Sequence, residues 1–456
     1  MAATIAIVCG SVFAAAASPD HASRPFRDMI GVNVKFSQGE PMTDLPLLTR
    51  LGVRWVRDSV DWQDVEPTAG QYRPFPAPFQ QRLDFYRANG IGVVFGLWYD
   101  NTAAYPNTPA DPAHSTNPAA YGRYAAEVTR QLRASGVRFV VELYNEPHNS
   151  LKWIGGTWNG APPCAWLDRY VEMVRAAAAD AKGADPSVRL LVDDDMWIIH
   201  YWFLERGLPP AIDGLAIHPY VKNWPEISAV AQDTTWVKPF DVVDADGSFR
   251  SAACRLRDHA ATKLGHTPAL WLTEWGWPIG GPVTADDHTM TEDMLAGLIP
   301  RAYLTAADAG IENLCWFSIR DSVDGPMGLT RNDGSHRKTF DAFAVMSDAL
   351  GDCTAIDHTA GGDHPTSGVQ AYRLARPDGT ATLVAWDIDG NRDATLAGPA
   401  SGVTDVFGHA VDAGRGTDGT LLLHLGQSPL YVCGVGRAAT VTPVVPSHLP
   451  PVDLFP

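Results

Sequence analysis

The sequence predicts an α/β protein: a (β/α)8 TIM barrel followed by an antiparallel β-sandwich-like domain. Short β-rich runs alternate with amphipathic helical stretches from about residue 29 to residue 321, and eight such runs can be distinguished. After about residue 345 the pattern changes to short alternating runs separated by Asp-Gly and Gly-Asn turns. The chain has 456 residues, 45% of them hydrophobic, which suits a barrel with a smaller module.

The eight strand candidates are rich in β-branched and aromatic residues. They lie at residues 29–36, 53–58, 91–98, 137–144, 188–193, 212–218, 268–273 and 311–318. Between them, stretches such as 117–135 and 165–182 have apolar residues at helical spacing. Helical stretches end in glycine before the next strand, as in "RLGVRW" and "RASGVRF", which is typical of a helix C-terminus. This alternation favours a parallel barrel closed by helices. A doubly wound sheet is disfavoured because no Gly-rich phosphate loop follows the first strand.

The chain divides into four predicted segments. Residues 1–18 form an apolar run of the length of a secretory signal peptide, which predicts a secreted or periplasmic protein. An ordinary buried segment is the alternative, because no Lys or Arg precedes the run. Residues 25–345 form the barrel, residues 346–437 a small all-β domain with hairpin turns, and residues 438–456 a Pro-rich tail that is extended or disordered.

Charge and composition exclude some classes of partner. The net charge is −17 and no basic stripe is present, so nucleic acid is not an expected partner. No apolar run is long enough to span a bilayer comfortably, and we expect a monomer. Fifteen Trp and thirteen Tyr residues supply either core packing or flat platforms for sugar rings.

The cysteines give no metal-site spacing, and no metal or cofactor is predicted. Five of them follow the N-terminal apolar run. Cys353 and Cys433 bracket the C-terminal domain and could be paired, and Cys164 with Cys254 is a second possible pair. Cys315, in an apolar strand, is the expected free thiol. A chain without disulfides is the alternative.

Polar and aromatic residues gather at the ends of the predicted strands. In a parallel barrel, functional residues lie at the C-terminal ends of the strands. These ends carry Arg57 and Asp58, Trp98 to Asn101, Asn145 to His148, Asp193 to Asp195, His218 to Tyr220, Glu274 to Trp277, and Trp316. A barrel built only for stability would not need such a rim.

Two carboxylates at this rim, Glu146 and Glu274, end the fourth and seventh strands and can face each other across the barrel mouth. Such a pair, about 5–5.5 Å apart, suits retaining glycoside hydrolysis. A cation such as Arg57 would keep the nucleophile ionised. Glu142 lies deeper in the fourth strand, and we expect it to point into the barrel and to pair with a cation or with hydrogen-bond donors, because an unpaired buried carboxylate is costly.

The motifs "ELYNEP" and "LTEWGWP", with "HPY" and the second-strand Arg in barrel order, resemble the retaining glycoside hydrolases of clan A. "ELYNEP" is especially close to family 39, which includes β-xylosidases, α-iduronidases and bacterial exopolysaccharide glycosidases. The resemblance covers roughly residues 29–345, and the chain beyond it resembles the β-module that accompanies such barrels. It implies hydrolysis of an oligo- or polysaccharide through a covalent glycosyl-enzyme intermediate, possible substrates including bacterial exopolysaccharide.

The resemblance also implies roles for individual residues. Glu146 would be the acid/base and Glu274 the nucleophile. Asn145 would hold the hydroxyl next to the anomeric carbon, while Arg57 and Tyr220 would hydrogen-bond Glu274.

Further residues are expected around this pair. His218 would support the acid/base or the substrate, and Trp316 would form the floor under the sugar, with a cis peptide after it. Trp98 stands in "WYDN", where many clan members place a His, and would shape substrate choice. Trp153 would wall a subsite. Asp193–Asp195 could either grip sugar hydroxyls or cap a helix.

Two other functions stay open on the residues alone: a non-catalytic polysaccharide-binding protein on a barrel scaffold, and a transglycosylase that shares the same intermediate. The presence of both Glu residues argues against the first. A metal-dependent amidohydrolase is disfavoured, because the first strand, "GVNVKF", lacks a His-x-His pair.

Overall fold

The computed structural model describes residues 24–151, 164–228, 237–283 and 288–444. The signal peptide expected in residues 1–18 lies outside the described residues, and so does Trp153.

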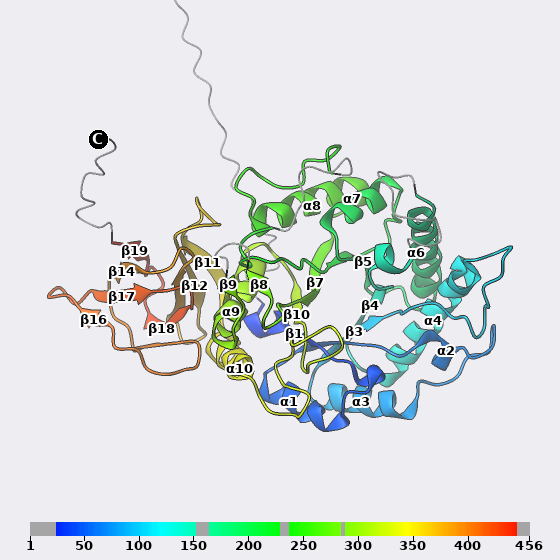
Figure 1. Ribbon diagram of the computed structural model, residues 1–456, viewed down its shortest axis with the longest axis horizontal. Helices are drawn as coiled ribbons and strands as arrows, with labels where there is room; N and C mark the ends of the chain where they lie inside the picture. The colour runs from blue at the N-terminus through cyan, green and yellow to red at the C-terminus, as the bar shows by residue number, and fades with distance from the viewer. Residues whose placement is uncertain (1–23, 152–163, 229–236, 284–287, 445–456) are drawn as a thin grey trace, which may run out of the picture.

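Eight parallel strands close into a barrel in the order β1-β10-β7-β6-β5-β4-β3-β2 (Figure 1). They are β1 (Ile30–Asn33), β2 (Trp55–Asp58), β3 (Gly92–Gly96), β4 (Phe139–Leu143), β5 (Leu190–Asp194), β6 (Gly214–Ile217), β7 (Ala269–Trp275) and β10 (Asn313–Trp316). Each lies within or across one of the eight predicted runs, so the predicted barrel is confirmed.

Helices surround the barrel and connect its strands (Figure 1). They are α1 (Leu45–Arg50), α2 (Trp62–Val65), α3 (Ala77–Ala88), α4 (Pro118–Ser135), α5 (Pro147–Ser150), α6 (Ala165–Ala184), α7 (Trp197–Glu205), α8 (Phe249–Leu264), α9 (Glu292–Asp308) and α10 (Lys338–Leu350). Short 3-10 turns lie at Phe26–Met29, Phe36–Gln38, Met42–Asp44 and His114–Thr116, and a two-stranded ribbon joins β8 (Pro282–Val283) to β9 (His288–Thr289).

Local signals set the helix ends. The side chain of Asn117 accepts a hydrogen bond from the backbone N–H of Ala120 at the start of α4. Gly136 ends the same helix at φ 72°, a left-handed conformation that glycine adopts without a Cβ clash. The predicted helical stretches 117–135 and 165–182 are confirmed as α4 and α6.

Side chains alternate in direction along each barrel strand, so they form two hydrophobic cores, one inside the barrel and one between the barrel and the helices. Val140 of β4 belongs to a small cluster inside the barrel, whereas Val141 and Leu143 pack outward in the large cluster beneath the helices. Glu142 has the same parity as Val140 and therefore points into the barrel. This strand thus delivers a carboxylate to the interior.

The C-terminal domain consists of two antiparallel sheets. One has the order β11 (Thr354–Ala360), β12 (Val369–Ala375), β13 (Ala381–Asp387), β18 (Leu430–Val435), β15 (Gly402–Thr404). The other has the order β16 (Gly414–Arg415), β17 (Leu421–Leu425), β14 (Arg392–Leu396), β19 (Val441–Pro443). Apolar side chains of both sheets, such as Leu383 and Leu423, share one core cluster, so the predicted antiparallel sandwich-like domain is confirmed. Strand β19 extends this domain into the stretch expected to be tail.

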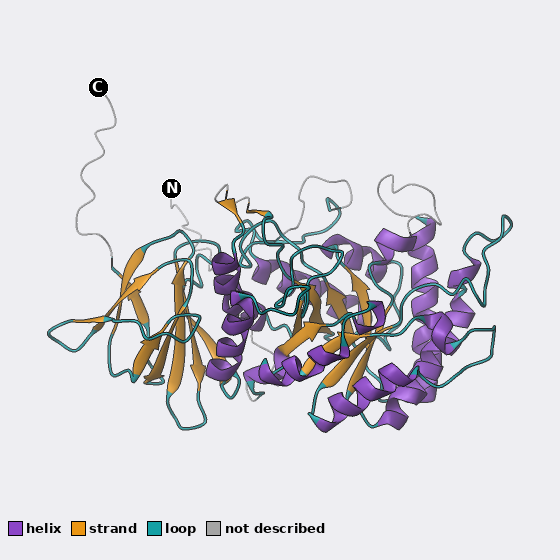
Figure 2. Ribbon diagram, turned by 60° about the horizontal axis from the view of Figure 1, so that its bottom comes forward, coloured by secondary structure: helices purple, strands orange, loops and turns teal. Residues whose placement is uncertain are grey.

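The domain packs against the barrel on the side of α9 and α10 (Figures 1 and 2). Trp386 on β13 donates its indole N–H to Glu226 at 3.0 Å, and Arg301 on α9 donates to both oxygens of the same carboxylate. Arg301 also donates to the carbonyl of Gln427 at 3.0 Å. This buried junction joins the loop after β6 to the C-terminal domain.

The expected disulfides are absent among the described residues. Cys164, Cys254, Cys315, Cys353 and Cys433 are all free thiols, so the proposed pairs Cys353–Cys433 and Cys164–Cys254 are wrong and the alternative without disulfides holds for them. Cys353 is buried next to the Ala349 carbonyl, which its Sγ contacts at 3.8 Å. Hydrophobic side chains are buried on both faces of the five-stranded sheet that contains β12, β13 and β18, and this burial stabilises the domain without a disulfide.

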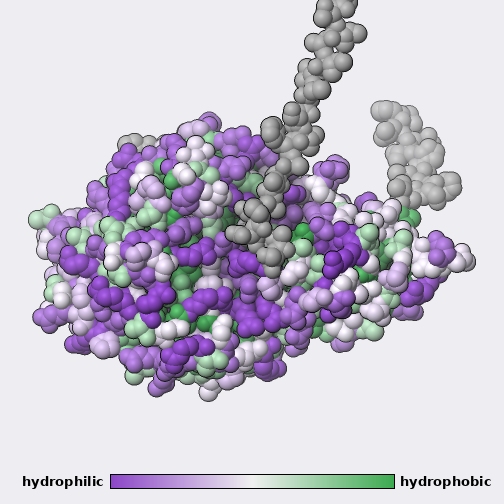
Figure 3. Space-filling view, turned by 180° about the vertical axis from the view of Figure 1, so that it is seen from behind, coloured by the Kyte–Doolittle hydropathy of each residue, from purple (hydrophilic) through white to green (hydrophobic). Residues whose placement is uncertain are grey.

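The face of the molecule opposite to Figure 1 carries hydrophilic residues with hydrophobic ones scattered between them (Figure 3). In the described part of the chain, no helix combines the length and the apolar character needed to cross a bilayer.

Candidate active site

A cavity of about 400 Å³ opens at the C-terminal ends of the barrel strands, a size within the usual range of ligand sites. It is lined by Arg57, Trp98, Tyr99, Asn145, Glu146, Tyr220, Glu274 and Phe317, together with Asn33, Val34, Lys35, Gln38, Val323, Asp324 and Met327. Six residues predicted for the site are therefore brought together around one cavity: Arg57, Trp98, Asn145, Glu146, Tyr220 and Glu274.

Arg57, at the end of β2, is the hub of the site and is only 1% exposed. Its Nε donates to Glu142 Oε2 at 2.6 Å, its Nη2 donates to Asn145 Oδ1 at 2.7 Å, and its Nη1 donates to Glu274 Oε1. The guanidinium also lies over the ring of Trp98, 4.7 Å from its centroid. The planar guanidinium of Arg57 thus fixes the positions of Glu142, Glu274 and Asn145.

Glu142 has the environment expected of it: it points into the barrel and pairs with Arg57. Complete burial raises the pKa of its carboxyl to about 7, in spite of the neighbouring cation. Glu142 lies beneath the cavity and supports Arg57 from below.

Glu274 reaches the cavity from the end of β7. The hydroxyl of Tyr220, from the loop after β6, donates to Glu274 Oε2 at 2.8 Å, while Arg57 holds the other oxygen. Both oxygens therefore accept hydrogen bonds, which fix the direction of the carboxylate.

Glu146 lies at the turn between β4 and α5 and is held by three groups. Its backbone has φ 44°, a left-handed conformation that is rare for a non-glycine residue and that concentrates at functional sites. The backbone N–H donates to Asp193 Oδ2 at 2.7 Å, and Asn149 Nδ2 donates to the side-chain Oε2 at 2.9 Å. His218 Nδ1 lies 2.8 Å from the other oxygen.

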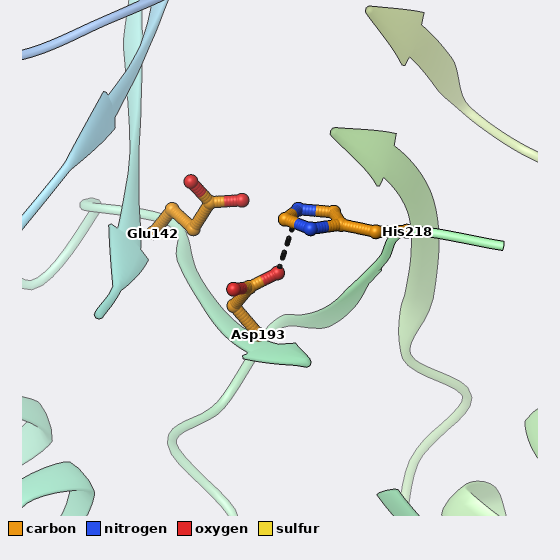
Figure 4. Close-up of side chains that lie close together, drawn as sticks. All are labelled: Glu142, Asp193 and His218. Atoms are coloured by element: carbon orange, nitrogen blue, oxygen red, sulfur yellow. Dashed lines mark ion pairs between the residues drawn. The ribbon is translucent and has the colours of Figure 1, made fainter. Parts of the chain in front are cut away.

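His218 and Asp193 form a buried pair, with Glu142 close by (Figure 4). His218 Nε2 lies 3.1 Å from Asp193 Oδ1 and 3.0 Å from Thr273 Oγ1. Burial alone would lower the pKa of His218, but the negative charges of Asp193 and Glu274 and the hydrogen bonds to Asp193 and Glu146 together outweigh it, and the pKa lies well above its usual value. This direction favours the imidazolium form of His218. Burial raises the pKa of Glu146, but the hydrogen bond from His218 outweighs it, so the net pKa is lowered.

The two rim carboxylates are close together. Glu146, His218 and Glu274 each offer one ligand atom within 4.8 Å of the other two. Glu142, Asp193 and His218 are grouped equally tightly one layer deeper. An imidazolium has no lone pair for a metal, so His218 in its charged form is a hydrogen-bond donor and not a ligand.

Asp193, Asp194 and Asp195 make two different sets of contacts, and none of the three lines the cavity. Asp193 orients Glu146 and His218. Asp194 and Asp195 hold His148 Nδ1 at 2.9 Å and 2.7 Å, and together they raise the pKa of that His to about 10, against the effect of burial. Asp194 Oδ1 also accepts a hydrogen bond from the backbone N–H of Met196 just before α7. Asp194 thus takes part in the start of α7, and Asp193 contacts Glu146 and His218 without lining the cavity.

Trp316 does not form the floor of the cavity. Its side chain is completely buried and packs against Trp277, with ring centroids 5.9 Å apart, in the core beneath the helices. The cis peptide expected after Trp316 occurs one residue later, between Phe317 and Ser318, and a second joins Trp98 to Tyr99. The reason for the correction is strand parity: Cys315 points into the barrel, so Trp316 points outward and Phe317 lines the cavity.

The side of the cavity formed by the loops after β1 and β10 has a charge pair that the sequence did not reveal. Lys35 Nζ pairs with Asp324, lies 3.2 Å from Ser322 Oγ and sits 4.5 Å from the centroid of the Phe317 ring. These residues are on two irregular loops, where no periodic pattern marks which side chains meet.

Comparison with known proteins shows which solved structures this fold is similar to. The closed barrel with an appended β-domain is similar in fold to solved glycoside hydrolases, among them two family 39 enzymes and a GH30 endoxylanase, so the resemblance found in the motifs is confirmed at the level of the fold. A family 39 glycoside hydrolase from Bacteroides cellulosilyticus WH2 superimposes with a TM-score of 0.71 at 20% identity, covering 90% of this chain and 81% of that one. The GH39 enzyme from Xanthomonas axonopodis pv. citri gives 0.52 at 15% identity, covering 93% and 96%.

Sequence identity to known proteins is low. No protein-family model matches the sequence. An arabinogalactan endo-β-1,4-galactanase from Thermothelomyces thermophilus is 24% identical over 255 residues, which is 50% of this chain and 72% of that protein.

Proposed function

We propose that the protein is a retaining glycoside hydrolase that acts on an oligo- or polysaccharide. The observation that carries this proposal is the proximity of Glu146 and Glu274, which offer oxygen atoms within 4.8 Å of each other. Retaining enzymes place their two carboxyl groups about 5–5.5 Å apart, whereas inverting enzymes leave about 6.5–9.5 Å for a water molecule. The similar proteins, among them a family 39 glycoside hydrolase and an endo-galactanase, support the reaction class.

In this mechanism the oriented carboxylate of Glu274 attacks the anomeric carbon while Glu146 protonates the leaving oxygen. The C–O bond to the leaving group breaks as the ester bond to Glu274 forms. Glu146 then removes a proton from water, which attacks the same carbon and releases Glu274. Asn145, held by Arg57, is placed to hydrogen-bond the neighbouring sugar hydroxyl.

The proton that Glu146 delivers is shared with His218. In the free protein the proton resides on His218, since its pKa is raised and that of Glu146 is lowered. A bound sugar excludes water from the cavity and disfavours the separated charges of an imidazolium–carboxylate pair, so the neutral pair with the proton on Glu146 becomes more favourable. The 2.8 Å contact between Nδ1 and Oε1 allows this transfer without movement of either side chain.

The charge of the protein and the aromatic residues of the cavity limit the class of glycan that suits the site. An acidic protein with a net charge of −17 and an aromatic cavity suits a neutral or weakly charged glycan, such as a xylan, a galactan or a bacterial exopolysaccharide. Action outside the cytoplasm is part of the proposal and rests on the apolar run in residues 1–18.

The test is covalent trapping with activated 2-deoxy-2-fluoro-glycosides of xylose, galactose, glucose and mannose, followed by peptide mapping. We expect one sugar to label Glu274 stoichiometrically, and Glu274→Gln to abolish the label. Glu312→Gln is the matched control, because that carboxylate holds the Trp271 indole at 3.1 Å, away from the cavity. If no sugar labels Glu274, the mechanism is wrong. Binding of a glycan without cleavage would favour the non-catalytic alternative, and transfer to sugar acceptors in preference to water would favour a transglycosylase.

A further inference from the structure

A second cavity, of about 500 Å³, adjoins the catalytic cavity, and the two share Tyr99 as a lining residue. Tyr99 is 37% exposed. Its ring packs edge-on against Tyr144 at 5.8 Å, and its hydroxyl accepts a hydrogen bond from Asn145 Nδ2 at 3.3 Å. Tyr99 is thus a fixed aromatic partition with a cavity on each side.

The chemistry of the second cavity suits a sugar. Besides Tyr99 and Tyr144, its lining includes the carboxylate of Asp100, the amide of Asn107 and the hydroxyl of Ser150. Asp100 is exposed and has no ion-pair partner in the described parts of the chain, so its oxygens are available as acceptors. Sugar hydroxyls need such acceptors and donors, and an aromatic ring offers a face on which the pyranose C–H groups can pack.

The position of the second cavity relates it to one side of the scissile bond. Its lining comes from the segment after β3, residues 99–116, and from residues 144–151 around the start of α5. Glu146 immediately precedes α5 and Ser150 ends it, so the cavity lies on the side of the proton donor. In the closed barrel β3 is opposite β7, which carries Glu274. Nucleophile and leaving oxygen occupy opposite faces of the anomeric carbon, and the proton donor attends the leaving oxygen.

We propose that the second cavity binds a sugar residue on the leaving-group side of the bond that is cleaved, so that the substrate is a glycan chain and not a glycoside of one sugar. This inference rests on the proposed function. Tyr99 would contact the chain as it passes from one cavity to the other, and Asp100 would accept hydrogen bonds from the more distant sugar.

Two variants that leave the catalytic groups in place test this. Asp100→Ala removes the acceptor, and Ser150→Trp fills the cavity. Asp84→Ala is the control, because Asp84 is also an exposed carboxylate but pairs with Arg87 on the outer helix α3. The substrates are the 4-nitrophenyl glycoside and the oligosaccharides of two to six residues of each sugar in the trapping panel. An ¹⁸O label at the reducing end shows how each chain lies across the site.

We expect Asp100→Ala and Ser150→Trp to lower kcat/KM about tenfold or more for chains extended on the leaving-group side, the loss expected for a missing hydrogen bond to a charged group. Hydrolysis of the aryl glycoside should change less than about twofold, a free-energy change below one hydrogen bond. Equal losses on both substrates, or losses only for extension on the other side, would overturn the inference. If the wild type cleaves chains and both variants cleave them equally well, the inference about the second cavity is wrong and the proposed function stands. A wild-type protein that cleaves nothing in the panel would refute both.

Discussion

Replacement of Arg57 by Met should destabilise the protein in a manner that depends on pH. Arg57 and Glu142 are 1% and 0% exposed and lie 2.6 Å apart, so the variant leaves a buried carboxylate without its cation. Removing one partner of such a pair costs about 3–5 kcal/mol of unfolding free energy. This corresponds to a rise of roughly 2–4 units in the pKa of Glu142, at about 1.4 kcal/mol per unit.

The direction in which stability changes with pH follows from the protonation of Glu142. In the wild type the pKa of Glu142 is raised to about 7 from an ordinary value of 4.5, so stability falls as pH rises from 4.5 and levels off above 7. In Arg57→Met the fall continues beyond pH 7, because Glu142 stays protonated to higher pH. The difference in unfolding free energy due to Glu142 is therefore small at pH 6 and approaches about 3–5 kcal/mol at pH 9 and above.

Urea unfolding followed by tryptophan fluorescence at pH 6 and pH 9 measures this difference. The double variant Arg57→Met/Glu142→Gln removes the stranded charge, and it should regain most of the lost stability at pH 9 while remaining inactive, because Glu274 still lacks its guanidinium. A loss that is equal at both pH values, or a double variant no more stable than the single one at pH 9, would refute the assignment of Glu142 as a buried structural carboxylate.

Three further predictions concern the proton donor, its support and the domain junction. Glu146→Gln should lower kcat by about 10²–10⁴-fold on glycosides with poor leaving groups and far less on 2,4-dinitrophenyl glycosides, which need no proton; equal losses on both would contradict its role. Asp193→Asn should lower the pKa of His218, which holds the shared proton in the free protein, so the alkaline limb of kcat/KM against pH, which reports loss of that proton, should move to lower pH; an unmoved limb would exclude this coupling. Trp386→Phe leaves the buried carboxylate of Glu226 without its indole donor and should reduce unfolding free energy by about 1–3 kcal/mol in urea titrations; unchanged stability would show that the junction does not depend on this bond.

The architecture and the reactive pair were accessible from sequence because they follow periodic rules. Alternation of strand and helix predicts the barrel, and the barrel places the strand ends at one rim, which brings Glu146 and Glu274 together. Strand parity also predicted that Glu142 points inward. The same parity, applied to the last strand from Cys315, would have selected Phe317 in place of Trp316 as the residue facing the cavity.

Features that could not be predicted from the sequence depend on contacts between loops, where apolar and polar residues follow no regular spacing. The meeting of Lys35 with Asp324, and the second cavity around Asp100, arise from irregular segments after β1, β3 and β10. Cysteine spacing was similarly uninformative, because bracketing a domain in sequence says nothing about whether Cys353 and Cys433 come within bonding distance.

The charge balance of the site explains how one carboxylate can act first as acid and then as base. Four carboxylates, Glu142, Glu146, Asp193 and Glu274, surround two cations, Arg57 and His218. While Glu274 is ionised within 4.8 Å of Glu146 and His218, its negative charge favours retention of the shared proton by that pair. Formation of the glycosyl ester neutralises Glu274, and that support for the proton disappears. The shared proton has by then left with the departing sugar, so Glu146 remains as a carboxylate beside a neutral His218, and the pair can take a proton from water. Under the proposed mechanism, the covalent step itself converts the acid into the base that the second step requires.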